Sequence, residues 1–266
     1  MKSDPFFLRS LKQESRNIWA HLKVKPKLKS KILKELDRDG ISITPGFFTI
    51  DQIDKLKHDA LKILSRTDLN IFKDDTESDF RAFGAEYFSS TIKEFCNNKE
   101  IQNTLEIYEG HKLELVFTMA NRVTPKDGNK GSGGGWHRDS PSRKQTKAIT
   151  YLTDVSSDNG PFQYIKRTHK PLDILKHRFK GNLSRNQKRI SDDEIKQILE
   201  HSNYTVEEVE AKAGDLILVD TRGIHRGKPI ISGERIALTN YYWKKREPLE
   251  HFKQLALHPL VFKDKK

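Results

Sequence analysis

The sequence has a single cysteine, Cys96, among its 266 residues, so it cannot form an internal disulfide bond. It also lacks a long apolar run, because the longest stretches, such as residues 216–219, are far shorter than the roughly 20 residues of a membrane-spanning helix. The N-terminal residues show neither the continuous apolar core nor the small-residue cleavage site of a secretory signal. These absences predict a chain that folds in a reducing compartment, which we expect to be the cytoplasm, without a transmembrane segment.

Two common catalytic signatures are also missing. The glycines between residues 128 and 135 are not followed by the Lys-Ser/Thr pair of a phosphate-binding loop, and Trp136 occupies the position of the last glycine in a dinucleotide-binding pattern. No Gly-x-Ser-x-Gly segment supplies a serine nucleophile. The glycine run therefore predicts a flexible hairpin loop, in which glycine lets the backbone pass close to a bound ligand.

Positive charge is present in excess, with a formal net charge of +12. Such a charge is compatible with nucleic acid, anionic lipid head groups or an anionic small substrate as a partner. Basic residues gather at positions 23–34 and, more densely, at positions 166–189, where Asp173 is the single acid. Phe179 is the only aromatic residue in the second run. Base stacking on a nucleic acid would require more aromatic side chains, so the small anionic substrate is favoured.

Periodicity predicts helices in the first part of the chain and strands from about residue 112. Residues 28–38 have the spacing of a helix, and Thr49 with Gln52 forms a capping box that starts a second one. Ser191 and Glu194 form a similar box further along. Strands are expected at residues 41–45, 112–123, 147–155, 160–166, 215–220 and 235–243. Several short strands with few helices between them predict an antiparallel barrel or a double-sheet jelly roll.

The same pattern suggests how the chain is divided. We expect a basic N-terminal arm at residues 1–27 and a single domain over residues 28–266. A basic helical insertion at about residues 166–212 separates the middle strands from the last ones. This insertion follows the strand that leaves the predicted site, and the family resemblance given below implies that it forms a lid.

The glycine loop leads into a possible metal-binding motif. In an extended chain His137 and Asp139 point to the same face, although a lone His-x-Asp pattern is common by chance. His225 follows the predicted strand at 215–220. Two histidines and one carboxylate, with the remaining metal positions open, form the facial triad of non-haem iron(II) oxygenases. A structural zinc site would instead close its fourth position, usually with cysteine, and Cys96 is the only cysteine available.

Arg235 opens the last predicted strand, ten residues after His225. Alternation places Arg235, Ala237, Thr239 and Tyr241 on one face of that strand. A guanidinium beside small residues suits a bidentate salt bridge to a carboxylate. We therefore expect Arg235 to anchor a dicarboxylate co-substrate rather than to form a surface ion pair.

These motifs, in this order, resemble the phytanoyl-CoA dioxygenase family of iron(II)- and 2-oxoglutarate-dependent oxygenases. The likeness covers nearly the whole chain from about residue 30 and lies in the segments ELDRDGISITPGFFTIDQIDKLK, WHRDS, TDVSSDNGPFQYIKRTHK, AGDLILVDTRGIH and SGERIALTNYYW. It implies a mainly β fold with flanking helices and a double-stranded β-helix core of the jelly-roll, cupin-like type. It also implies iron ligation by His137, Asp139 and His225, and 2-oxoglutarate binding by Arg235 with help from Ser232. Oxygen is the second co-substrate of such enzymes.

Two departures from the family pattern concern the substrate. Arg167 and Thr168 replace the Gly-Ser that the family has before His169, and Ile230 stands where an asparagine is frequent. Both positions border the substrate pocket in the family, so they affect the expected substrate rather than the expected metal. Asp139 is retained where related halogenases have a small residue, which implies hydroxylation.

The resemblance and the charge together predict hydroxylation of an unactivated C–H bond of an anionic small molecule, for example an acyl thioester, a phosphorylated or nucleotide-linked sugar, or a lipid head group. Lys166, Arg167 and Lys170 are the expected substrate contacts in the basic insertion. Two alternatives stay open: an oxidative demethylase acting on nucleic acid, and a non-catalytic barrel that binds an anionic polymer. Peripheral contact with a membrane also stays open, and the sequence does not predict the oligomeric state.

Overall fold

The computed structural model describes residues 15–16, 18–19, 22–23, 25–139, 144–179, 183–184, 187–245 and 261. The predicted arm at residues 1–27 therefore lies largely outside the described residues. The helical elements are η1 (Lys25–Lys27), α2 (Lys31–Asp39), α3 (Ile50–Leu64), η2 (Ala85–Tyr87), α4 (Ser90–Cys96), α5 (Lys99–Glu109), α6 (Pro171–Phe179) and α7 (Asp192–Glu200). The strands are β1 (Ile41–Thr44), β2 (Phe72–Lys73), β3 (Asp79–Phe83), β4 (Leu113–Val123), β5 (Thr146–Tyr151), β6 (Phe162–Ile165), β7 (Val206–Val209), β8 (Leu216–Asp220), β9 (His225–Gly227) and β10 (Arg235–Lys244).

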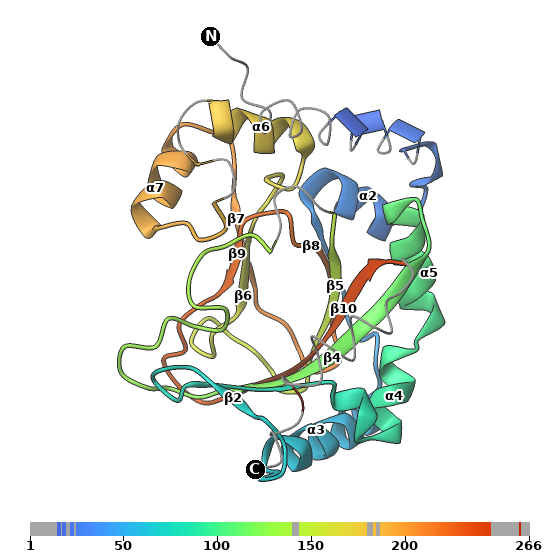
Figure 1. The fold of residues 1–266 in the computed structure, drawn as a ribbon, viewed down its shortest axis with the longest axis vertical. Coiled ribbons are helices and arrows are strands. Elements are labelled where there is room, and N and C mark those ends of the chain that lie inside the picture. Colours follow the sequence, from blue (N-terminus) through green and yellow to red (C-terminus); the bar gives the residue numbers. More distant parts are fainter. Residues whose placement is uncertain are drawn as a thin grey trace.

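Two antiparallel sheets form the centre of the molecule (Figure 1). The large sheet has the strand order β1-β8-β5-β10-β4-β3-β2, and the small one has the order β7-β6-β9. A buried apolar cluster joins their facing sides, with Ile149 and Val219 from the large sheet and Phe162 and Tyr164 from the small one. Two facing antiparallel sheets whose neighbouring strands are distant in sequence make a double-stranded β-helix, so the predicted jelly-roll core is confirmed.

Helices α2, α3, α4 and α5 cover the outer face of the large sheet (Figure 1). Leu56 of α3 and Leu105 of α5 belong to the same apolar cluster as Ile236 and Leu238 of β10. The outward positions of β10 are therefore part of the main core. Its inward positions face the small sheet, as the alternation of apolar and polar residues predicts.

The predicted helix starts and ends are mostly confirmed. The first helix begins at Lys31, three residues later than the spacing predicts, because Ser30 caps it by accepting from the Leu33 N–H. It ends at Gly40, whose φ of 85° is the left-handed conformation that glycine adopts without strain. Both capping boxes form, at the starts of α3 and α7. The strands β2, β3 and β7 and the helices α4 and α5 were not identified from the sequence.

The basic insertion holds α6 and α7, followed by β7, which pairs with β6 in the small sheet. Ile195 and Ile198 of α7 pack with Trp136 and Ile224, which adjoin the predicted metal ligands. The helical part of the insertion therefore lies over one end of the small sheet (Figure 1). A lid function for this segment stays a prediction. Across the described residues no helix is both long enough and apolar enough to span a membrane.

Candidate metal centre

Backbone pairing brings the two predicted histidine ligands together. His137 forms isolated bridges with His225 of β9 and with Arg189. The N–H of each histidine donates to the carbonyl of the other, both at 2.9 Å, and the Asp139 N–H donates to the Thr221 carbonyl at 3.1 Å. The His-x-Asp segment thus extends the small sheet beside β9. As a result the two imidazole rings lie side by side, with 4.3 Å between their centroids.

The three predicted ligands converge on one point. One ligand atom from each of His137, Asp139 and His225 lies within 4.8 Å of the others. Asp139 Oδ1 is 3.7 Å from His137 Nε2 and 3.8 Å from His225 Nε2. The Nδ1 atoms of the two histidines lie 2.9 Å from the carbonyls of Gly135 and Gly223. Nδ1–H therefore donates to the backbone in both rings, which leaves the Nε2 lone pairs for a metal.

The residues present fit a metal ion. His225 Nε2 is buried and has no hydrogen-bond partner among the described residues. A buried polar atom without a partner costs about 1–3 kcal/mol. The unpaired Nε2 of His225 therefore indicates that a metal ion accepts its lone pair. Two imidazoles and one carboxylate beside an open cavity match the donor set of a non-haem ferrous site rather than a closed zinc site.

The protonation states also suit metal binding. Burial lowers the pKa of His137 to about 4 and that of His225 to about 3. Burial opposes ionisation of Asp139, but the nearby Lys147 ammonium and the two histidines hold the pKa of Asp139 well below its ordinary value. At neutral pH the site therefore consists of two neutral imidazoles and one carboxylate, which are the forms that ligate metals.

The glycine loop packs directly against this site. Gly133 has a φ of 93°, and a Cβ there would lie 2.6 Å from His137 Cε1. At Gly131 a side chain would collide with the carbonyl of Gly227 in β9. Both positions therefore require glycine, because the loop passes so close to a metal ligand and its neighbouring strand. The close contact that these glycines permit is therefore with the protein's own imidazole and with β9, and a close approach to a bound ligand stays a prediction.

A cavity of about 320 Å³ opens beside the triad, and all three ligands line it. The inward residues of β10, namely Arg235, Ala237, Thr239 and Tyr241, form part of its wall. Arg235 is buried and donates to the carbonyl of Gly160, while its Nε has no hydrogen-bond partner among the described residues. Burial lowers the pKa of Arg235, yet a guanidinium stays charged in proteins. A buried cation with an unsatisfied donor is suited to an anionic ligand.

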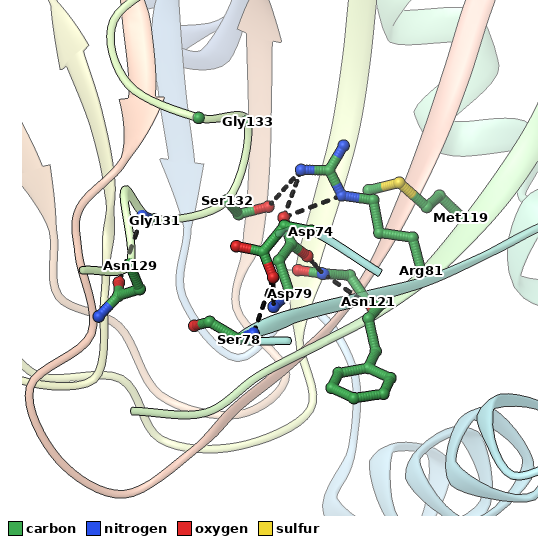
Figure 2. A network of polar contacts seen from close by, with 12 residues as sticks. Asp74, Ser78, Asp79, Arg81, Met119, Asn121, Asn129, Gly131, Ser132 and Gly133 are labelled. Atoms are coloured by element: carbon green, nitrogen blue, oxygen red, sulfur yellow. Dashed lines mark hydrogen bonds and ion pairs between the residues drawn. The ribbon is translucent and has the colours of Figure 1, made fainter. Parts of the chain in front are cut away.

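A chain of polar contacts runs from Arg235 to the glycine loop. Arg235 Nη2 lies 3.4 Å from Asn121 Oδ1, and Asn121 donates in turn to Asp79. Asp79 Oδ2 accepts from Arg81 Nε at 3.0 Å, and Arg81 Nη2 lies 3.4 Å from Ser132 Oγ. Figure 2 shows the Arg81 guanidinium between Asp79 and Ser132. Arg81 could not be identified from the sequence, because only the pairing of β3 with β4 places it beside Asn121.

Four other predicted site residues lie away from this cavity. Ser232 is in an exposed turn, where its carbonyl accepts from Asn159 Nδ2 at 2.9 Å. Lys166 forms an ion pair with Glu207, Arg167 is exposed, and Lys170 is half-buried. None of the four lines the cavity as the described residues define it. Their roles in binding co-substrate or substrate stay predictions.

The far end of the same basic run does reach the cavity. Lys188 and Arg189 both line it, and Arg189 is paired with His137 in the extended small sheet. The Arg189 guanidinium donates to the carbonyls of Gly133 and Gly134 in the glycine loop. The sequence placed these two residues in the basic run but gave no signal that they, rather than residues 166–170, lie next to the triad.

Comparison with known proteins gives a family. The family model for phytanoyl-CoA dioxygenase (PhyH) matches residues 36–237, a range that includes the triad and Arg235. Ectoine dioxygenase of Halomonas elongata is 22% identical over 152 residues, which are 52% of this chain and 45% of that protein. The match thus spans less than half the length of this curated relative.

Solved structures show the same fold at low identity. The alpha ketoglutarate dependent carbocyclase SnoK from nogalamycin biosynthesis has a TM-score of 0.65 and 15% identity, with 86% of this chain and 91% of that one covered. The epimerase SnoN in complex with Fe3+, alpha ketoglutarate and nogalamycin RO has a TM-score of 0.63 and 16% identity, over 80% and 82%. EctD from S. alaskensis with bound Fe has a TM-score of 0.62 and 18% identity, over 79% and 75%. Since the family model covers most of the chain and all three converging ligands, the chain belongs to the phytanoyl-CoA dioxygenase family.

Proposed function

We propose that the protein is an iron(II)- and 2-oxoglutarate-dependent oxygenase that hydroxylates an unactivated C–H bond of an anionic small molecule. The observation that carries the proposal is the convergence of His137, Asp139 and His225 at the wall of a cavity that also contains the buried Arg235. Family membership supports the reaction class. The carboxylate of Asp139 supports hydroxylation, because it occupies the position that a halide would need.

Each residue has a distinct role in this proposal. His137, Asp139 and His225 would hold the ferrous ion, and Arg235 would bind the distal carboxylate of 2-oxoglutarate. When bound, iron and 2-oxoglutarate would supply the oxidising power: one atom of oxygen would enter succinate as 2-oxoglutarate loses carbon dioxide, and the other would become the hydroxyl group of the product. The buried cavity wall would keep water from the reacting carbon, and the rigid strand β10 would fix the co-substrate relative to the triad.

The charge of the cavity supports an anionic substrate. Asp139 is the only acid among the residues that line it, and its charge is matched by Lys147. Lys188 and Arg189 have no acidic ion-pair partner among the described residues. The two positive charges of the ferrous ion would balance the two negative charges of 2-oxoglutarate. Lys188 and Arg189 would then be available to bind the substrate. Lys166, Arg167 and Lys170 are proposed as further contacts from the insertion.

An anaerobic titration tests the proposal. Iron(II) followed by 2-oxoglutarate should give a weak visible charge-transfer band, and the band should be absent from His137→Ala. A screen of anionic metabolites should then find compounds that stimulate succinate release. Succinate release by His137→Ala at the wild-type rate would contradict the assignment. A steeply salt-dependent affinity for polynucleotide without succinate formation would favour the polymer-binding alternatives instead.

A further inference from the structure

Lys147 is a buried cation next to the proposed metal, and neither the family motifs nor the charge runs of the sequence identify it. It lies within β5, where it is paired with Val219 of β8 on one side and with Tyr241 of β10 on the other. Its side chain is 9% exposed, and its ammonium lies 4.3 Å from the centre of the Tyr241 ring. The stem is therefore fixed by the sheet, and the charged end has little freedom to move.

The Lys147 ammonium contacts one particular atom of the triad. Its Nζ lies 2.6 Å from Asp139 Oδ2, whereas Asp139 Oδ1 faces both histidine Nε2 atoms at 3.7 and 3.8 Å. The two oxygens of the carboxylate are thus divided between two partners. Lys147 contacts Oδ2, and Oδ1 is directed at the point where the three ligands meet.

We propose that Lys147 is a positioning residue that holds Asp139 as a one-oxygen ligand of the metal. The inference rests on the proposed iron site. An octahedral ion with three single-atom protein ligands has three positions left, two for a chelating co-substrate and one for oxygen. A carboxylate that bound through both oxygens would take one of those three. By keeping Oδ2 engaged, Lys147 keeps the third position open and raises the affinity of the site for metal.

Two other roles for Lys147 are less consistent with the contacts. As a substrate ligand it would have to leave Asp139, and that would leave a largely enclosed carboxylate without its cationic partner, which is unfavourable. A purely structural role for the Lys147–Asp139 ion pair would add little stability, because a buried ion pair is often no more stabilising than apolar residues of the same size. Outer partners of metal ligands, by contrast, typically contribute about 10- to 100-fold to metal affinity.

Cobalt(II) is the probe for the test, because its visible spectrum reports both binding and coordination number. The full chain would be titrated anaerobically in the wild-type form and as Lys147→Met, Lys147→Gln and Lys147→Arg. Lys212→Met is the matched control, since Lys212 forms an ion pair with Asp154 at the exposed surface. Thermal unfolding of each metal-free variant would verify that it folds, and Lys147→Gln keeps a hydrogen-bond donor if Lys147→Met does not fold.

We expect Lys147→Met to bind cobalt(II) about 10- to 100-fold more weakly than wild type. Its bound spectrum should also differ from that of wild type, because the second oxygen of Asp139 would replace a water ligand. Lys147→Arg should recover most of the affinity, and Lys212→Met should match wild type. In an Asp139→Asn background the Lys147→Met change should add almost nothing, because Lys147 acts through that carboxylate.

Three results would overturn the inference: a Lys147→Met variant with wild-type affinity and spectrum, an equal loss in the Asp139→Asn background, or a wild-type chain that takes up no cobalt(II). The last result would also overturn the proposed iron site. The titration contains no 2-oxoglutarate or substrate. The titration would therefore decide the role of Lys147 even if the protein bound cobalt(II) but had no oxygenase activity.

Discussion

The two faces of β10 perform different tasks in the same ten residues. The outward side chains of Ile236, Leu238 and Tyr242 belong to the apolar cluster beneath the helices. The inward residues Arg235 and Thr239 line the cavity beside the metal ligands. Because the side-chain period of a strand is two, stability and ligand binding can be changed at adjacent positions. Substitutions on the two faces should therefore have separable effects on stability and on ligand binding.

Removal of a metal ligand should give the largest loss. His137→Ala should weaken metal binding by more than the roughly 10- to 100-fold that loss of an outer partner costs, and substrate-dependent succinate release should fall to background. The metal-free variant should unfold at nearly the wild-type temperature, since His137 Nε2 faces the site. His58→Ala, at an exposed position in α3, is the control and should leave both properties unchanged. Metal titration and calorimetry would measure the two effects.

The outward face should determine stability. Leu238→Ala removes a fully buried side chain, so we expect a loss of about 2–5 kcal/mol in the free energy of unfolding. Cobalt(II) affinity of the folded fraction should stay within twofold or so of wild type, because the triad lies on the opposite side of the sheet. Urea unfolding, with Thr239→Ala on the inward face as the comparison, would measure the difference. An equal loss of stability in both variants would refute the division between the faces.

The inward face should determine co-substrate binding. Arg235→Gln removes a charge-assisted contact worth about 1.5–3 kcal/mol, so the affinity for 2-oxoglutarate should fall roughly 10- to 150-fold. Cobalt(II) affinity should not change, because Arg235 is not a ligand. Arg122→Gln is the matched control, since Arg122 pairs with Glu234 on the exposed surface near the start of the same strand. Unaltered 2-oxoglutarate affinity in Arg235→Gln would show that another cation of the cavity binds the co-substrate.

Arg167 offers a smaller test at the edge of the small sheet. It has a φ of 72°, a left-handed conformation that costs a residue with a Cβ about 1–2 kcal/mol and glycine almost nothing. Arg167→Gly should therefore raise the free energy of unfolding by about 1 kcal/mol. If Arg167 contacts the substrate, the same variant should also raise the Michaelis constant. A more stable variant with an unchanged Michaelis constant would show that Arg167 does not contact the substrate.

The smallest expected effect is that of pH on metal binding. In the folded protein the pKa values of His137 and His225 are lowered by burial to about 4 and 3, so both rings are already neutral at pH 6. A metal then displaces no proton from them, and its affinity should be nearly constant from pH 8 to pH 6, falling only as the pH approaches 4. Exposed histidines with ordinary pKa values near 6.5 would instead lose affinity below pH 7. Cobalt(II) titrations at pH 8, 7 and 6 distinguish the two cases.

Local geometry explains why the sequence could predict which of these side chains lie close together. His137 and Asp139 share a face because they are two residues apart in an extended segment, and the inward face of β10 follows from simple alternation. That His225 joins them followed from the order of the motifs and the family likeness. These parts depend on local chain geometry or on motif order, so one sequence is sufficient to predict them.

The missed residues depend on contacts that are distant in sequence or irregular. Lys147 meets Asp139 only because β5 and the His-x-Asp segment face each other across the two sheets. Arg81 reaches the cavity through the register of β3 with β4. The charge run at residues 166–189 is visible in the sequence, but the path of the folded chain decides which of its ends lines the cavity. Composition and periodicity carry no information about such register and helix placement.

An anomalous-scattering map from crystals of the cobalt(II)-loaded protein would test the central claim most directly. We expect one strong peak within bonding distance of His137 Nε2, Asp139 Oδ1 and His225 Nε2, with Lys147 still in contact with Asp139 Oδ2. A peak at any other place, with these three atoms free of metal, would contradict it.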